Sequence, residues 1–269
     1  DFMIKRTVGQ LGEILSYEAL DYNEDAVNSK SEEINKVIDD VPVSEIVQFI
    51  EESNKIYYGS LSLFNRKAIA LAILNSANNE KISNNQNMKD KFTLSFVEKF
   101  ELEESNVKTL QGQTSNDELF DVLKNKFLEG DFIQMLIYIW EKILSKGEEE
   151  DESEIQLVEN AAEKYSLESQ NINETKKLGT ERSKIARAID SILSGKTAYN
   201  KLKAFEKNVL IGLLLTECSS VGGAISPENL KDLKKLLNDQ LNISSNAAVV
   251  LLEKKLSESL LKKVDQVEV

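Results

Sequence analysis

The sequence predicts an all-α fold, and three observations support that prediction. The chain of 269 residues contains only 2 prolines and 11 glycines, so most of its length has no strong helix breaker. Leu, Ile, Lys, Glu, Ser and Asn are abundant, whereas aromatic residues make up only 7%, which favours helices over a β-sandwich. Apolar residues also recur at spacings of three and four, as in Ile155, Val158, Ala162 and Tyr165, and this spacing places them on one helix face.

A short phrase recurs along the chain and marks a repeated helical unit. It reads Phe100-Glu-Leu102-Glu-Glu-Ser-Asn-Val107, and it returns as Tyr165-Ser-Leu167-Glu-Ser-Gln-Asn-Ile172 and as Leu241-Asn-Ile243-Ser-Ser-Asn-Ala-Ala248. An earlier version is Val41-Pro-Val43-Ser-Glu-Ile46. In each version an apolar residue precedes a Ser or Glu, where a new helix is expected to begin. A Ser side chain can accept a hydrogen bond from a free backbone N–H, and early acidic residues suit the helix dipole.

Each unit is predicted to contain an apolar helix, a polar turn, an amphipathic helix, the phrase and one further helix. The predicted apolar helices are Met3–Tyr17, Lys67–Ala77, Phe132–Leu144 and Lys207–Cys218. The predicted amphipathic helices are Ser31–Asp39, Met88–Phe100, Glu154–Tyr165 and Pro227–Gln240. Ser226 followed by Pro227 is a strong helix start, and Gly179 and Gly195 are predicted to be helix C-caps.

These elements predict four related helical units, packed as one or two bundles with about twelve or more helices. Residues 1–112 would hold units one and two, and residues 113–269 would hold units three and four. The predicted seams are the polar segments 111–117 and 171–180.

Parts of the chain resemble the tellurite-resistance TerB-like domain, a small all-helical fold with an internally duplicated half. Ser219-Ser-Val-Gly222-Gly223-Ala-Ile225-Ser226-Pro-Glu228 resembles the family's acidic turn, and Asn79-Glu-Lys-Ile82-Ser83 is a shorter echo of it. Tyr165-Ser-Leu167-Glu-Ser resembles the family's closing phrase. Gly222 stands where the family has Asp. The resemblance implies, as an alternative division, one TerB-like domain over residues 60–178 with helical extensions at both ends. It also implies a role in stress-response or envelope-linked assemblies, with divalent metal as a ligand.

Charge and composition disfavour several functional classes. The formal net charge of -13 works against general binding to nucleic acid or to anionic membranes, which needs a surplus of Lys and Arg. The absence of histidine removes the commonest general base and the usual zinc ligand. The single cysteine, Cys218, is expected to be a buried structural thiol. No apolar run reaches the ~18 residues of a membrane span. We expect a cytoplasmic protein that is not an enzyme, or alternatively a component of a viral particle or a secretion assembly.

An acidic segment near the start of the chain resembles a calcium-binding loop. Asp21, Asn23 and Asp25 fill the first three ligand positions of an EF-hand, and Glu32 falls where the bidentate Glu belongs. Ala26 departs from the pattern, because the sharp turn of such a loop requires Gly. The alternative interpretation is a solvated acidic turn.

A second acidic run, residues 148–154, contains six acidic residues in seven positions. Glu148, Glu150 and Asp151 could bind Ca²⁺ or Mg²⁺ weakly, or they could contact a basic partner. The alternative is that these acidic residues favour the start of the following helix through its dipole.

Two further segments can each be interpreted either as functional or as purely structural. Residues 176–207 contain nine basic and three acidic residues, which could meet the acidic run of another copy or an anionic ligand. The alternative is a solvated helix face. The aromatic stretch with Phe132, Tyr138 and Trp140 is predicted to belong to the core.

The leading functional prediction is a non-catalytic interaction or structural module that acts through protein partners or self-assembly. The second is an acidic divalent-metal sensor that uses the two acidic segments. The third is a particle component of a virus or a secretion apparatus.

Overall fold

The computed structural model describes residues 38–77, 86–113, 117–146, 151–194, 199–220 and 225–254. Within these ranges the fold is all-α, as the sequence predicts, with 11 α-helices and no strands. The α-helices are α3 (Ile46–Glu52), α4 (Leu63–Ser76), α6 (Gln86–Phe100), α7 (Glu104–Gln113), α8 (Asp117–Lys126), α9 (Glu129–Ser145), α10 (Glu152–Tyr165), α11 (Ser169–Leu193), α12 (Ala204–Ser220), α13 (Pro227–Leu241) and α14 (Ser245–Glu253). Three short 3-10 helices are η1 (Val43–Glu45), η2 (Tyr58–Ser60) and η3 (Tyr199–Lys201).

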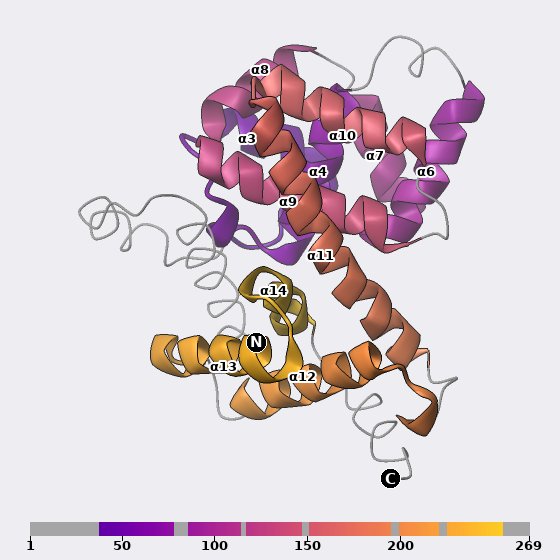
Figure 1. Cartoon of the computed structure of the whole chain (residues 1–269). Helices are drawn as coiled ribbons and strands as arrows, with labels where there is room; N and C mark the ends of the chain where they lie inside the picture. The colour runs from indigo at the N-terminus through magenta and orange to yellow at the C-terminus, as the bar shows by residue number, and fades with distance from the viewer. Residues whose placement is uncertain are drawn as a thin grey trace.

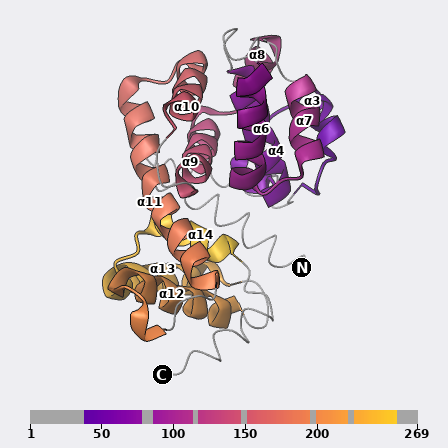
Figure 2. The same ribbon diagram turned by 90° about the vertical axis from the view of Figure 1, so that its right-hand side faces the viewer.

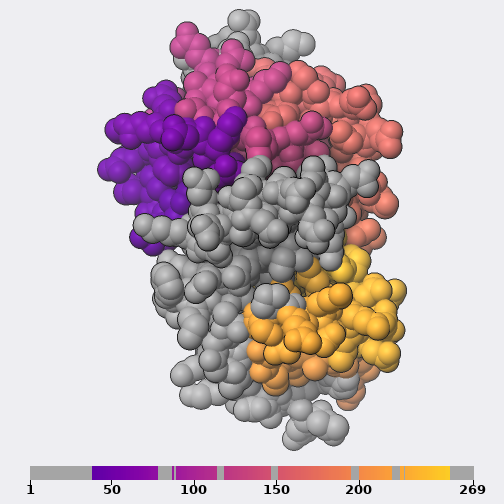
Figure 3. Space-filling view, turned by 90° about the vertical axis from the view of Figure 1, so that its left-hand side faces the viewer, coloured from indigo at the N-terminus to yellow at the C-terminus, as the bar shows by residue number. Residues whose placement is uncertain are grey.

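The helices form two bodies that share the long helix α11 (Figure 1). Helices α3 to α10 surround one apolar cluster, which extends along the chain from Val43 to Leu167. Helices α12, α13 and α14 surround a second cluster, to which α11 contributes Ile185, Ala188 and Ile189. The view turned by 90° shows α11 passing from α9 and α10 toward α12 and α14 (Figure 2). A space-filling view shows residues of the two bodies at opposite ends of the molecule (Figure 3). Helix α11 therefore joins two separate apolar cores.

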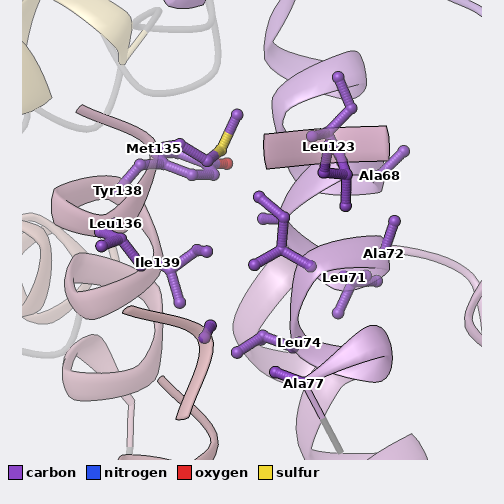
Figure 4. Packing of buried hydrophobic residues seen from close by; sticks show 14 of the residues in the cluster. Ala68, Leu71, Ala72, Leu74, Ala77, Leu123, Met135, Leu136, Tyr138 and Ile139 are labelled. Carbon is purple, nitrogen blue, oxygen red and sulfur yellow. The ribbon is translucent and has the colours of Figure 1, made fainter. Parts of the chain in front are cut away.

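The first core is built around α4 and α9, and both helices are buried because most of their residues are apolar. Almost every residue of α4 from Asn65 to Ser76 is buried, as expected for a central helix that is apolar on several sides. Met135 and Ile139 of α9 point toward α4, where Leu71 and Leu74 lie (Figure 4). The prediction that the aromatic stretch of this helix belongs to the core is confirmed, because Phe132, Tyr138 and Trp140 are all fully buried.

The predicted order of helices is found in the described parts of the last three units. The apolar helix, the amphipathic helix and the helix after the phrase are α4, α6 and α7, then α9, α10 and α11, then α12, α13 and α14. The anchor residues Val43, Leu102, Leu167 and Ile243 are all buried. Helix α8 was not predicted. The predicted helix Met3–Tyr17 lies outside the described residues.

Local capping chemistry explains where several of these helices begin. Ser226 accepts a hydrogen bond from the backbone N–H of Asn229, so the predicted start of α13 is confirmed. Ser244, in the last copy of the phrase, accepts one from the N–H of Ala247. Asn242 ends α13 in the left-handed conformation with φ of 55°, which Asn tolerates better than most residues.

Two predictions about the second half of the chain are wrong. Gly179 is not a C-cap, because it lies inside α11. The candidate seam 171–180 lies in the same helix, which joins the two clusters, and as a domain boundary it stays a prediction. Cys218 is exposed and not buried, because it lies on the side of α12 that faces away from the second cluster. Gly195 lies outside the described residues.

The division of the chain into domains stays a prediction. The proposed boundary between residues 112 and 113 falls between α7 and α8, and both helices contribute to the first cluster through Leu110 and Leu119. None of the helices in the described part of the chain is long and apolar enough to span a bilayer.

Candidate functional site

Charged and phenolic side chains are buried or partly buried where the two helical bodies meet. We call the following seven residues the junction cluster: Tyr58, Arg66, Tyr138, Glu141, Lys142, Arg182 and Glu253. They come from η2, α4, α9, α11 and α14, so both bodies contribute. Ionised groups are costly to bury unless they are paired and hydrogen-bonded, and such groups often mark functional sites.

Arg66 links the first body directly to the second. Its Nη1 donates a hydrogen bond of 2.6 Å to Oε1 of Glu253, which is 187 residues away in the sequence. The guanidinium also lies 4.3 Å from the centre of the Tyr58 ring, within range of a cation–π interaction. Burial works against the charge of Arg66, but Tyr58 and Glu253 raise its pKa above the ordinary arginine value. Nε and Nη2 of Arg66 have no hydrogen-bond partner among the described residues.

Arg182 is buried without a carboxylate partner in the described part of the chain. Its Nε donates to Oδ1 of Asn246 at 2.9 Å, and its Nη2 donates to Oε1 of Gln134 at 3.3 Å. Its Nη1 has no partner among the described residues. Only 1% of the residue is exposed. Arg182 therefore connects α9, α11 and α14 through neutral amides while its charge stays uncompensated by an ion pair.

Glu141 and Lys142 form the third charged contact of the junction cluster. Lys142 Nζ lies 2.8 Å from Oε1 of Glu141 and 5.0 Å from the centre of the Tyr138 ring. Burial works against the charge of Lys142, but Glu141 raises the pKa of the ammonium above its ordinary value. Burial also raises the pKa values of Tyr58 and Tyr138, so both phenols are neutral. Oε2 of Glu141 has no partner in the described ranges.

A pocket of about 70 Å³ opens beside the junction cluster, and we call it the junction pocket. Residues of α4, α9, α11 and α14 line it, so its wall belongs to both bodies. The charged residues of its lining are Lys67, Lys99, Glu101, Glu141, Lys142, Lys146, Asp190, Glu253 and Lys254. Lysines outnumber carboxylates five to four in this lining.

The lysines of the junction pocket create a positive potential. Burial lowers the pKa of Lys67, Glu101 opposes this shift, and the nearby charges of Lys142 and Lys254 add to the lowering. Burial alone would raise the pKa of Glu101, but Lys254, Lys67, Lys146 and Lys142 together bring it below the ordinary value. Lys67 and Lys146 share this one carboxylate, at 3.6 and 3.4 Å. The lysines of the pocket thus favour negative charge at the position of Glu101.

Of the seven predicted metal ligands, the structure describes Asp151, and the metal sites stay a prediction. Asp21, Asn23, Asp25, Glu32, Glu148 and Glu150 all lie outside those residues. Asp151 is the N-cap of α10: its Oδ1 accepts a hydrogen bond of 2.9 Å from the N–H of Ser153, and its Oδ2 lies 2.5 Å from Lys91 Nζ. For Asp151, the alternative interpretation of a helix-starting acid fits these contacts.

Replacing Asp151 by alanine is expected to lower the free energy of unfolding by about 1 kcal/mol at pH 7, because the N-cap is lost. Burial would raise the pKa of Asp151, but hydrogen bonds from Lys91 and Ser153 lower it overall. An acid with a lowered pKa stabilises the fold above its unfolded pKa, and this contribution disappears as the pH falls through the folded pKa. Urea unfolding should therefore distinguish wild type from Asp151→Ala at pH 7 and much less at about pH 2. An equal difference at both pH values would contradict a contribution from the ionised carboxylate.

The sequence did not reveal the junction cluster. Arg66 lies in the segment Phe64-Asn-Arg66-Lys67, which matches no catalytic pattern, and Arg182 lies in the basic segment interpreted as a solvated face. One available signal was the position of Arg182 among small residues, next to Ser183 and three residues after Gly179, on a helix face that could pack closely.

Comparisons with known proteins leave the site to be interpreted from its own geometry. No protein-family model, curated protein or solved structure matches this chain.

Proposed function

We propose that the protein is a non-catalytic helical module that assembles through the outward face of α12. Ile211, Leu214 and Cys218 follow one another at spacings of three and four residues, so they lie on one side of this helix. Ile211 is 37% exposed and Cys218 is exposed, whereas Leu214 is half-buried. Leu215, also half-buried, packs against the second core. The opposite side of α12 supplies Val209 and Leu213 to the second core.

The observation that supports this proposal most is that α12 is apolar on both sides. A surface helix normally carries polar residues on its outer side, and exposed apolar patches mark sites of protein association. A second copy of the chain is the partner that we propose, because one apolar surface can serve both sides of a two-fold symmetric contact. The TerB-like resemblance suggests stress-response or envelope-linked assemblies as the setting for this role.

The test is the solution mass of the full chain and of the variant Ile211→Glu, measured by light scattering over a range of concentrations. We expect the wild type to exceed the monomer mass of 30.3 kDa and the variant to match it, because a buried charge at the contact is costly. Gln170→Glu adds the same charge at an exposed position of α11 and should leave the mass unchanged. A wild type that stays monomeric at all concentrations would contradict the proposal.

The divalent-metal prediction can be tested in the same measurement. Addition of Ca²⁺ or Mg²⁺ should change the solution mass only if metal binding and assembly are linked. A calorimetric titration with each ion then reports on metal binding itself.

A further inference from the structure

We propose that the junction pocket binds inorganic phosphate and that the bound anion holds the two helical bodies together. Four features of the pocket support this site: its charge, its available hydrogen-bond donors, an acceptor without a partner among the described residues, and a lining that comes from both bodies. The site does not involve the α12 face proposed for assembly.

The first observation is an excess of positive charge in the cluster and around the pocket. The cationic groups of the cluster and the pocket are Arg66, Arg182, Lys67, Lys99, Lys142, Lys146 and Lys254. The carboxylates around them are Glu101, Glu141, Glu154, Glu181, Asp190 and Glu253. Seven cations thus meet six carboxylates. An uncompensated charge in a poorly hydrated site is unfavourable, and an anion would compensate it.

The second observation is that two of the five pocket lysines, Lys67 and Lys254, make only long contacts with carboxylates of the described residues. Lys67, whose side chain is only 13% exposed, approaches Glu101 no closer than 3.6 Å. Lys254 lies 3.9 Å from Asp190. Charge-assisted hydrogen bonds are normally about 2.7–2.9 Å long, so both ammonium groups have donors to offer to a ligand. Lys142 is close enough to Lys67 to lower its pKa, which places a third ammonium group beside them.

The third observation selects phosphate among the oxyanions. Glu141 is 1% exposed, lines the pocket and has an Oε2 without a hydrogen-bond partner among the described residues. This carboxylate oxygen needs a donor. Phosphate near neutral pH carries at least one P–OH group that can donate to Glu141, while its other oxygens accept from lysines. Sulfate has no such proton and would meet the Glu141 carboxylate with repulsion alone.

The size and the position of the pocket agree with a small ion. Its volume of about 70 Å³ is several times the ~10–15 Å³ that one water molecule needs, and residues of α4, α6, α9, α11 and α14 line it. A free phosphate fits this space better than a large phosphomonoester. Because Lys67 and Lys142 belong to the first body and Lys254 follows α14 in the second, one anion would contact both.

The experiment is an isothermal titration of the full chain with inorganic phosphate at pH 7, at low ionic strength, with sulfate and glycerol phosphate as parallel ligands. We expect saturable binding of one phosphate per chain, with both other ligands at least about tenfold weaker. Phosphate should also raise the unfolding temperature. No saturable heat up to about 10 mM phosphate would overturn the proposal. Sulfate binding as tightly as phosphate would overturn the role of Glu141, and tighter glycerol phosphate binding would show an ester as the ligand and overturn the choice of free phosphate.

Three variants make the test specific. Lys67→Gln and Lys254→Gln should each weaken phosphate binding by about tenfold or more, because each removes one charged donor. Glu141→Gln should remove the preference for phosphate over sulfate, because an amide can donate to either ion. Lys108→Gln removes an exposed lysine that pairs with Glu104 on α7, and it should bind as the wild type does. Circular dichroism checks that each variant is folded. Unchanged phosphate binding by folded Lys67→Gln and Lys254→Gln would overturn the proposal.

Discussion

Replacing Arg66 by methionine is expected to lower the free energy of unfolding by about 3 kcal/mol, because it leaves a buried carboxylate without its partner. Glu253 has a side chain that is 11% exposed, and its ion pair of 2.6 Å is with Arg66. The substitution also removes the cation that lies over the Tyr58 ring. Urea unfolding followed by the fluorescence of Trp140, the single tryptophan, would measure the loss.

A double substitution separates the ion pair from simple packing. Arg66→Met combined with Glu253→Met should recover most of the stability, because an apolar pair of similar size avoids the cost of an unpaired buried charge. The matched control is Lys108→Met, which breaks an exposed ion pair on α7 and should cause no measurable change. If the double variant were as unstable as Arg66→Met alone, the ion pair would not be the cause of the loss.

Local sequence signals predicted most of the helices well. Phe132–Leu144 was predicted and Glu129–Ser145 is found, and Pro227–Gln240 was predicted and Pro227–Leu241 is found. These predictions succeed because helix periodicity and capping depend on residues within one or two turns of each other. The N-cap Ser226 and the buried anchor Ile243 are examples of such local information.

The junction cluster could not be predicted, because it depends on contacts between residues that are far apart in the sequence. Arg66 and Glu253 are 187 residues apart, and nothing near either residue indicates the other. Arg182 lies in a basic segment whose ordinary interpretation is a solvated face, yet it is buried because α9 and α14 cover its side of α11. Tertiary contacts between distant helices decide these positions, and propensity and composition do not report on them.

Glycine can end a helix or allow two helices to pack closely, and Gly179 does the second. A glycine after Leu178 suggests a helix end, because glycine adopts the left-handed C-cap conformation easily. In the structure it lies in the middle of α11, where a Cβ atom would be 2.2 Å from Cβ of Trp140 and 3.1 Å from the carbonyl oxygen of Ile137. Glycine is therefore required here by the close approach of α11 to α9 and not by its backbone freedom.

This close approach leads to the second large expected effect. Gly179→Ala should lower the free energy of unfolding by roughly 3 kcal/mol, even though alanine is the better helix former, because the helices must separate to admit the methyl group. The atom it would meet, Cβ of Trp140, is fixed to the backbone and cannot rotate away. The displacement would also reach Glu141, whose backbone nitrogen lies 3.2 Å from the added atom, and hence the junction cluster.

Gly112 provides a matched control within the same protein. It lies in α7 with nothing within 4 Å of an added Cβ atom, so Gly112→Ala should raise the free energy of unfolding by about 0.5 kcal/mol through helix propensity alone. Urea unfolding of both variants, with Trp140 fluorescence as the signal, would compare the two effects directly. Equal stabilisation by both substitutions would mean that α9 and α11 leave room for a methyl group at position 179, which contradicts the distance of 2.2 Å from an added Cβ atom to Cβ of Trp140. If Gly179→Ala lowers the free energy of unfolding and Gly112→Ala raises it, the close packing of α11 against α9, and not helix propensity, is the reason for glycine at position 179.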